Sequence, residues 1–208
     1  MTTPSTPLAM ALAQSKSEER ATPLSAFRMA RRWWLEGRRL NLSLLAEELG
    51  VGRATLMRWV GNKDLLMGEI LWSLYKTVYD ETIDNARAVP GLEGVDFLTR
   101  IYSDINHALL EAKPLHDFLH NEPQWALQLL TSNISGLQDR LIETWRRLLE
   151  EQIAAGNIAP EMDAENLAFY IIKIGEGLIY CDMICGRKPN PGPAATAFRL
   201  LVSGRAPN

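Results

Sequence analysis

The feature that most constrains the fold is the spacing of the apolar residues, which recur every three or four positions along most of the chain. This is the period of a helix that buries one face. Alternating runs of valine, isoleucine and threonine between turn residues, which would indicate strands, are missing from the 208-residue sequence. The chain is therefore predicted to be all-α.

Glycine, proline and asparagine divide this pattern into segments. A glycine or proline after a periodic stretch ends a helix, and an asparagine before one caps it. The stretch "GRKPNPGPAA" disfavours helix around 186–192. Helices are expected over 24–36, 42–49, 53–59, 62 to just before Pro90, 95–111, 135–154, 164–184 and 193–202, with short ones after Pro114 and from Pro123.

Charge is unevenly distributed along the chain. Residues 1–66 contain ten lysine or arginine residues and six acidic ones, whereas the remainder contains twelve and nineteen. The whole chain has a formal net charge of −3. A basic front on an acidic body predicts a polyanionic partner for the front alone.

The apolar runs are too short for a membrane span, which needs about 20 residues. The N-terminal stretch "MTTPSTPLAMALAQSKSEER" lacks the basic leading segment of a signal peptide. We therefore expect a flexible N-terminal arm, no membrane partner and a cytoplasmic location.

The basic front contains two short helical segments joined by about three residues around Gly50. Helices joined in this way fit a helix-turn-helix, whose second helix lies in the major groove of DNA. Arg53 and Arg58 would be long donors to guanine or phosphate, and Thr55 adds a hydroxyl. An ordinary helical hairpin with solvated arginines would show the same pattern.

Residues 24–66 resemble the DNA-binding domain of the TetR family of bacterial repressors. The stretch "AAGNIAPEMDAENLAFYIIKIGEGL" also resembles the last third of that family. Within residues 24–66, the residues that match the family pattern in register are Leu45-Ala46, Gly50-Val51, Thr55-Leu56, Lys63-Asp64 and Leu66.

The chain departs from the family pattern at several positions. Gly52 replaces a serine cap and Ala54 replaces a glycine. Met57, Trp59 and Val60 stand where tyrosine, histidine and phenylalanine are usual. In the family the tyrosine and the histidine usually touch phosphates, so the resemblance leaves the contacts of Met57 and Trp59 open. The predicted DNA-binding residues are Asn41, Ser43, Arg53, Thr55, Met57, Arg58, Trp59 and Lys63.

The resemblance also implies a ligand cavity within the C-terminal helices. A cavity lined by aromatic rings with a few polar tips suits an apolar or amphiphilic small molecule. Plain core packing would use the same rings. The candidate ligand-binding residues are Trp72, Tyr75, Tyr79, Tyr102, Asn106, His107, Phe118, Trp125 and Trp145.

The segment 164–184 is apolar on more than one face, and such a helix should be buried. A partner subunit would cover it, and the resemblance implies a dimer interface made by the last two long helices. A central helix of a monomer is the alternative. The predicted dimer residues are Leu167, Tyr170, Ile171, Ile174, Leu178, Phe198 and Leu201.

A helical metal-dependent hydrolase using His116 and His120 is the rival hypothesis. The two histidines are four residues apart, but Asp117 breaks the HExxH pattern. Cys181 and Cys185 are expected to be core residues rather than a disulfide or a metal site. A third hypothesis is a helical adaptor that has lost DNA binding. Neither a catalytic residue nor a cofactor nor a metal is predicted.

Together these observations predict an arm over 1–22, a helix-turn-helix DNA-binding domain over 23–66, and a helical ligand-binding and dimerisation domain over 67–208. The predicted protein is a homodimeric repressor that leaves double-stranded operator DNA when it binds a small apolar or amphiphilic effector. A lactone or an acyl compound is one candidate effector.

Overall fold

The computed structural model describes residues 21–181, 186 and 190–203. Within these residues every regular element is a helix, which confirms the all-α class. None of the described helices is long and apolar enough to cross a membrane. Nearly all of the predicted arm, and Cys185, lie outside the described residues.

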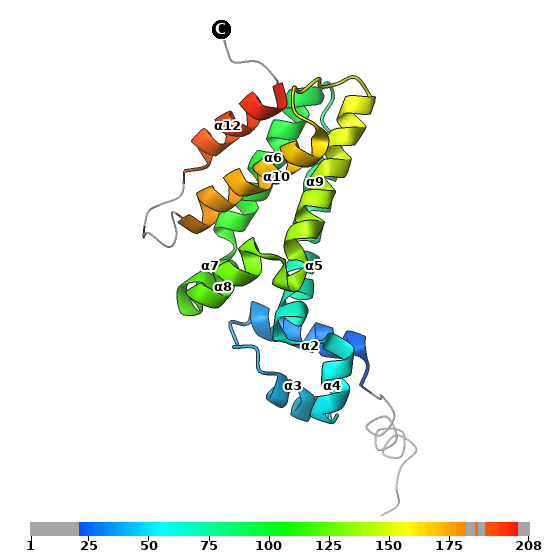
Figure 1. Cartoon of the computed structure of the whole chain (residues 1–208), viewed down its shortest axis with the longest axis vertical. Coiled ribbons are helices and arrows are strands. Elements are labelled where there is room, and N and C mark those ends of the chain that lie inside the picture. Colours follow the sequence, from blue (N-terminus) through cyan, green and yellow to red (C-terminus); the bar gives the residue numbers. More distant parts are fainter. Residues whose placement is uncertain (1–20, 182–185, 187–189, 204–208) are drawn as a thin grey trace, which may run out of the picture.

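The N-terminal lobe, at the foot of Figure 1, consists of α2 (Pro23–Leu35), α3 (Leu42–Glu48) and α4 (Arg53–Val60). Local caps define the beginnings of two of these helices. A capping box at Thr22 opens α2, and the Asn41 side chain accepts hydrogen bonds from two backbone N–H groups at the start of α3. These caps agree with the helix boundaries expected from the sequence.

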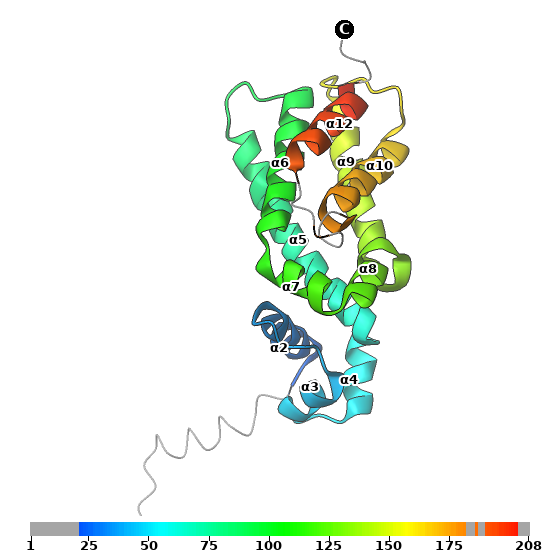
Figure 2. The same ribbon diagram turned by 90° about the vertical axis from the view of Figure 1, so that its left-hand side faces the viewer.

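The upper lobe is a bundle built on α5, which packs on α6 and α9, while α12 packs on α6 and α10. In Figure 2, α7 and α8 cross the base of the bundle, between it and the N-terminal lobe. The elements are α5 (Lys63–Arg87), α6 (Gly94–Glu111), α7 (Lys113–Asn121), α8 (Pro123–Thr131), the 3₁₀ turn η1 (Asn133–Ser135), α9 (Leu137–Ala154), α10 (Ala164–Glu176), the π turn η2 (Gly177–Cys181) and α12 (Pro191–Ser203).

Several elements differ from the expected boundaries, among them the helix expected over 135–154, which begins at Leu137 after a 3₁₀ turn. The helix expected over 164–184 ends as an α-helix at Glu176 and continues as the π turn η2. The last helix begins at Pro191, two residues early, because proline is tolerated in a first helical turn, where the N–H has no helical partner.

One connected hydrophobic core runs through both lobes. Because α5 is continuous from Lys63 to Arg87, it crosses the predicted domain boundary after residue 66 without a break. Gly68 lets α5 approach η1 closely, since a Cβ there would lie 2.7 Å from the Ser135 carbonyl oxygen. The N-terminal lobe is therefore carried on a helix that belongs to the upper bundle.

Candidate DNA-binding and ligand-binding sites

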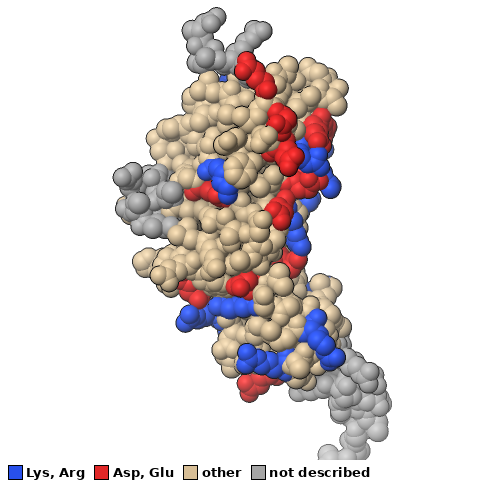
Figure 3. Space-filling model, viewed as in Figure 1, with Lys and Arg blue, Asp and Glu red and all other residues tan. Residues whose placement is uncertain are grey.

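The predicted recognition helix α4 presents Arg53 and Arg58 to solvent. Leu56, on the opposite face, is fully buried, and α4 packs against α2 and α3. The Arg58 guanidinium lies 3.5 Å from the Thr55 hydroxyl. On the face drawn in Figure 3, basic side chains predominate over the lower lobe, whereas acidic ones are frequent along the upper lobe. The arrangement matches a short basic helix held for insertion into a groove.

The other predicted DNA-binding residues of this lobe are less free. The Asn41 oxygen is engaged as the α3 cap, 2.9 Å from the Ser43 backbone nitrogen. Ser43 itself is exposed, whereas Met57 and Trp59 are half-buried, and Trp59 packs against the core. The structure gives Trp59 a packing role in addition to any contact with DNA.

Lys63 faces the protein rather than open solvent. Its Nζ lies 3.5 Å from the centre of the Trp125 ring and 3.6 Å from a Glu122 carboxylate oxygen. The same carboxylate pairs with Arg39 at 3.0 Å, and the Trp125 indole donates to Asp64 at 2.6 Å. We call these five residues the interlobe junction, because they join the N-terminal lobe and the start of α5 to α8.

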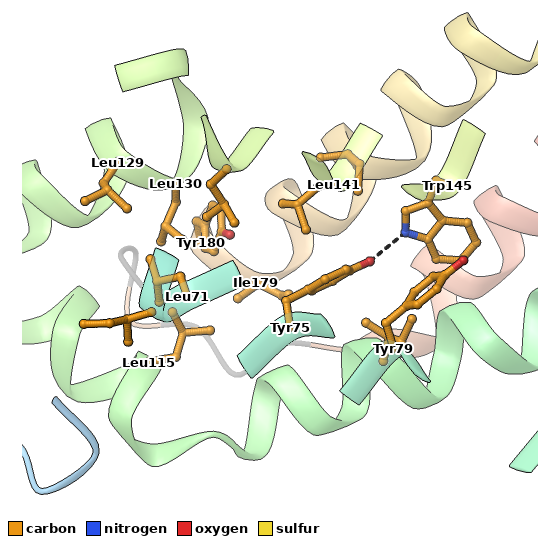
Figure 4. Packing of buried hydrophobic residues seen from close by; sticks show 14 of the residues in the cluster. Leu71, Tyr75, Tyr79, Leu115, Leu129, Leu130, Leu141, Trp145, Ile179 and Tyr180 are labelled. Atoms are coloured by element: carbon orange, nitrogen blue, oxygen red, sulfur yellow. Dashed lines mark hydrogen bonds between the residues drawn. The ribbon is translucent and has the colours of Figure 1, made fainter. Parts of the chain in front are cut away.

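The upper bundle encloses a largely apolar cavity of about 280 Å³. Its walls come from α5, α6, α9, α10 and the π turn, and α2, α7 and α8 also contribute. Figure 4 shows part of the buried hydrophobic core around the cavity, in which Tyr75 and Trp145 point toward each other. The apolar lining includes Leu71, Leu74, Ile105, Leu109, Leu115, Leu130, Leu137, Leu141, Ile171, Ile172 and Ile179.

Polar groups in the cavity are few. The Trp145 indole N–H donates to the Tyr75 hydroxyl at 2.9 Å. The Tyr102 hydroxyl is buried and has no hydrogen-bond partner. Burial raises the pKa of Tyr102 to about 12, and the Asn106 side chain, which lies close to the hydroxyl without completing a hydrogen bond of normal geometry, opposes this rise. The cavity suits an apolar molecule with few polar groups.

The family model described as Tetracyclin repressor-like, C-terminal domain, matches residues 93–203, more than half of the chain. The chain belongs to the TetR family. It is thus a ligand-responsive transcriptional regulator that binds DNA, and not an enzyme. Its partners, at the level the family defines, are operator DNA, a small effector and a second copy of the chain.

A solved structure supports the same fold. The chain is similar to the R. erythropolis transcriptional repressor QsdR from the TetR family, with a TM-score of 0.78 and 24% identity. The match covers 89% of this chain and 96% of that one. No curated protein matches the sequence.

Four of the predicted ligand-binding residues of this TetR-family regulator line the cavity, and five do not. Those in the lining are Tyr75, Tyr102, Asn106 and Trp145. Those outside it are Trp72, Tyr79, His107, Phe118 and Trp125.

The five residues outside the cavity have other contacts. His107 is exposed and lies 3.2 Å from Glu111, so its predicted place in the lining was wrong. Phe118 packs edge to face against Trp125, which belongs to the interlobe junction. Trp72 stacks on Tyr75 from outside the cavity, and Tyr79 packs against Trp145 with its hydroxyl 3.4 Å from the Thr144 carbonyl oxygen.

Sequence reasoning missed the contribution of α2 to the cavity. Arg31, Trp34 and Leu35 line it, although they belong to the predicted DNA-binding domain. Their helical spacing indicated only a buried face, and nothing in the pattern showed which element would cover it. Tyr180 and Glu176, from the end of α10 and the π turn, were missed for the same reason.

The predicted dimer residues divide into two groups. Leu167, Ile171, Leu178 and Phe198 are buried by their own chain, so their assignment to a subunit interface was wrong. Phe198, for example, stacks on Tyr102 with ring centres 4.4 Å apart. The remaining three, Tyr170, Ile174 and Leu201, line a surface groove between α10 and α12 together with Met162, Ala197 and Leu200.

The two histidines of the rival hydrolase hypothesis do not form a metal site. The His116 ring nitrogen lies 2.6 Å from the Leu110 carbonyl oxygen, and His120 is exposed. Asp117 is paired with Lys113. In the described part of the chain, no three potential metal ligands cluster. Membership of the TetR family agrees with this, and nothing favours the hydrolase.

Proposed function

We propose that this protein is a dimeric repressor that leaves its operator when a small apolar or amphiphilic molecule occupies the cavity in the upper bundle. The observation that carries the proposal is the shared wall: Arg31, Trp34 and Leu35 of α2 line the cavity, and the same helix supports α3 and α4. An occupant would therefore touch the DNA-binding lobe directly. A lactone or an acyl compound remains a candidate occupant.

On the DNA side, we assign base contacts to Arg53 and Thr55 and phosphate contacts to Arg58. Exposure of both arginines on a helix anchored by Leu56 supports this assignment. Residues at the start of a recognition helix usually contact base edges. Asn41, Ser43 and Trp59 would position the backbone of the duplex at the edge of the same surface.

We assign the dimer contact to the groove between α10 and α12. Tyr170 and Leu200 are 47% and 41% exposed in the single chain, and Ile174 lines the same groove. Apolar side chains gathered on one surface are typical of a subunit interface. A second copy of the chain would cover them and would place a second α4 for the other half of a palindromic operator.

Release from the operator would follow from a change in the position of α2. A ligand shifts an equilibrium only by binding two states with different affinity. Displacement of α2 moves α3 and α4 with it, so the two recognition helices of the dimer no longer meet both half-sites together, and affinity for DNA falls.

Selection of duplexes by the full-length protein from a random-sequence pool tests this function. We expect enrichment of an imperfect palindrome, because a twofold dimer presents two α4 helices. Binding should weaken with salt, since phosphate contacts release counterions. Absence of any enriched sequence would remove the repressor proposal. A thermal-shift screen of small molecules, followed by duplex binding with each hit, then tests release.

A further inference from the structure

Tyr102 lines the cavity, and its buried hydroxyl makes no hydrogen bond of normal geometry, although the Asn106 side chain lies near it. The side chain is only 3% exposed, and its ring is fixed between Phe198 and Trp145. Burying a hydroxyl without a hydrogen bond is unfavourable, because the group gives up its hydrogen bonds to water. An occupant that accepts a hydrogen bond from this hydroxyl would recover that cost.

Asn106 and Gly175 shape the space in front of this hydroxyl. The Asn106 Nδ2 donates to the Tyr102 carbonyl oxygen at 2.9 Å, which turns Oδ1 toward α10. A Cβ on Gly175 would lie 3.4 Å from Asn106 Oδ1 and 3.8 Å from the Tyr102 hydroxyl oxygen. The missing side chain of Gly175 therefore leaves a notch bordered by one donor and one acceptor.

The charges around the cavity disfavour an anion in this notch. Glu176, the neighbour of Gly175, lines the cavity, and its carboxylate is held by Lys173 at 2.8 Å and by Gln138. Arg31 belongs to the wall contributed by α2 and donates to the Ser73 hydroxyl at 3.2 Å. A carboxylate in the notch would bring a full negative charge beside the Asn106 oxygen, whereas an uncharged carbonyl oxygen carries only a partial charge and is repelled less.

We propose that the effector is an uncharged carbonyl compound whose carbonyl oxygen occupies the notch at Gly175 and accepts a hydrogen bond from Tyr102. The remainder of the molecule is apolar and fills the leucine- and isoleucine-lined part of the cavity. This assignment rests on the proposed function, because it names the chemical class of the ligand that acts through the same cavity.

Three probes with similar apolar chains test the class: methyl nonanoate, nonanoate and nonane. Their binding to the full-length dimer is measured by calorimetry or by the fluorescence of the tryptophans. We expect methyl nonanoate to bind more tightly than nonanoate, and more tightly than nonane once each affinity is corrected for transfer from water. Tighter binding of nonanoate, as for a carboxylate held by Arg31, would overturn the proposal.

Tyr102→Phe removes only the donor. We expect it to weaken the binding of methyl nonanoate about three- to tenfold, as for the loss of one hydrogen bond, and to leave the binding of nonane unchanged. The melting temperature of the free protein should stay the same or rise, because an unpartnered buried hydroxyl is removed. Tyr79→Phe is the matched control outside the cavity, and it should change neither affinity. Equal affinity of Tyr102→Phe and the unmodified protein for methyl nonanoate would overturn the proposal.

Gly175→Ala fills the notch without a clash. We expect it to weaken the binding of methyl nonanoate about tenfold. The melting temperature should stay the same or rise, because alanine has a higher helix propensity than glycine. Gly177→Ala is the control, since an added Cβ there meets nothing within 4 Å. Unchanged affinity of Gly175→Ala for methyl nonanoate would overturn the placement of the carbonyl oxygen at Gly175.

Operator binding measured without a ligand separates this proposal from the proposed function. If operator binding persists while the probe results fail, only the ligand class is wrong.

Discussion

At the scale of single residues, the two arginines of α4 differ in their surroundings. Arg58 leans on Thr55, whereas Arg53 stands in the first turn beside Gly52, which provides no side-chain cap. The first turn of α4 is thus open to an approaching base edge. This difference leads to different expectations for the two side chains on DNA.

We predict that Arg53→Ala costs roughly 1–3 kcal/mol of binding free energy at one base position of each half-site. The loss should be measured with duplexes that carry single base changes, because only a base contact makes the cost depend on sequence. Arg147→Ala, which removes an exposed arginine from α9, is the control and should leave operator affinity nearly unchanged. A uniform loss over all duplexes with Arg53→Ala would make it a phosphate contact instead.

Individual side chains were also where sequence reasoning was least complete. The pattern marked Lys63 as a cation at a helix start, which fits a phosphate contact, but Glu122 and Trp125 are 59 or more positions away and pair with it only after folding. Likewise, Tyr79 and Tyr75 lie on the same helix four residues apart, yet only Tyr75 lines the cavity. Long-range packing decides both cases.

At the scale of elements, the interlobe junction is the polar connection between α5, α8 and the N-terminal lobe. Glu122 holds Arg39 and Lys63 at once, and the Arg39 side chain is 78% exposed. Ion pairs at exposed positions contribute little to stability, about 0–1 kcal/mol each. The junction is better placed to align the two lobes than to stabilise either.

We predict that Glu122→Gln reduces the effect of an effector on operator affinity, because α8 then follows the N-terminal lobe less closely. The measurement is the ratio of operator Kd with and without an effector identified by screening. Glu151→Gln is the control, since it breaks a similar pair, to Arg87, within the upper lobe. An unchanged ratio in Glu122→Gln would show that α2 and α5 transmit the change without the junction.

Most elements could be predicted from the sequence because their ends depend on local chemistry. Asn41 and Asn62 cap α3 and α5 as expected, and Gly50 ends the first helix of the helix-turn-helix with φ +65°. The π turn at Gly177–Cys181 could not be predicted, because apolar spacing does not distinguish an α-helix from one that widens over its last turn.

At the scale of the whole molecule, the single chain leaves an apolar groove on α10 and α12 without a cover. Hydrophobic periodicity identified the two helices but could not separate residues covered by the chain itself, such as Leu167, from those facing outward, such as Tyr170. Both lie on an apolar helix, and only the tertiary structure shows which side is filled.

We predict that Leu200→Asp dissociates the dimer, because it places an unpaired charge in the proposed interface, where burial of a charge is costly. Leu200 is exposed in the single chain, so the fold itself should tolerate the change. Sedimentation velocity measures the result. Val89→Asp, at another exposed apolar site beyond the groove, is the control and should remain dimeric. A stable dimer with Leu200→Asp would place the interface elsewhere.

The dimer, the cavity and α4 together also make a thermodynamic prediction. If the effector weakens operator binding by some factor, the operator must weaken effector binding by the same factor, because the coupling free energy is reciprocal. Typical coupling of about 1–3 kcal/mol corresponds to about 5- to 150-fold. Titrating the dimer with effector in the presence and absence of saturating operator duplex measures one factor, and the converse titration measures the other.

The Leu200→Asp variant provides the control for this measurement. As a monomer it should keep its cavity, which lies within one chain, and so bind the effector with nearly unchanged affinity. It can engage only one half-site at a time, so the loss of bivalent binding should lower operator affinity even without effector. Because release acts through the separation of two recognition helices, the effector should then have little further effect on DNA binding. A monomer that still responded fully would show that the effector changes the N-terminal lobe itself rather than the spacing between two of them.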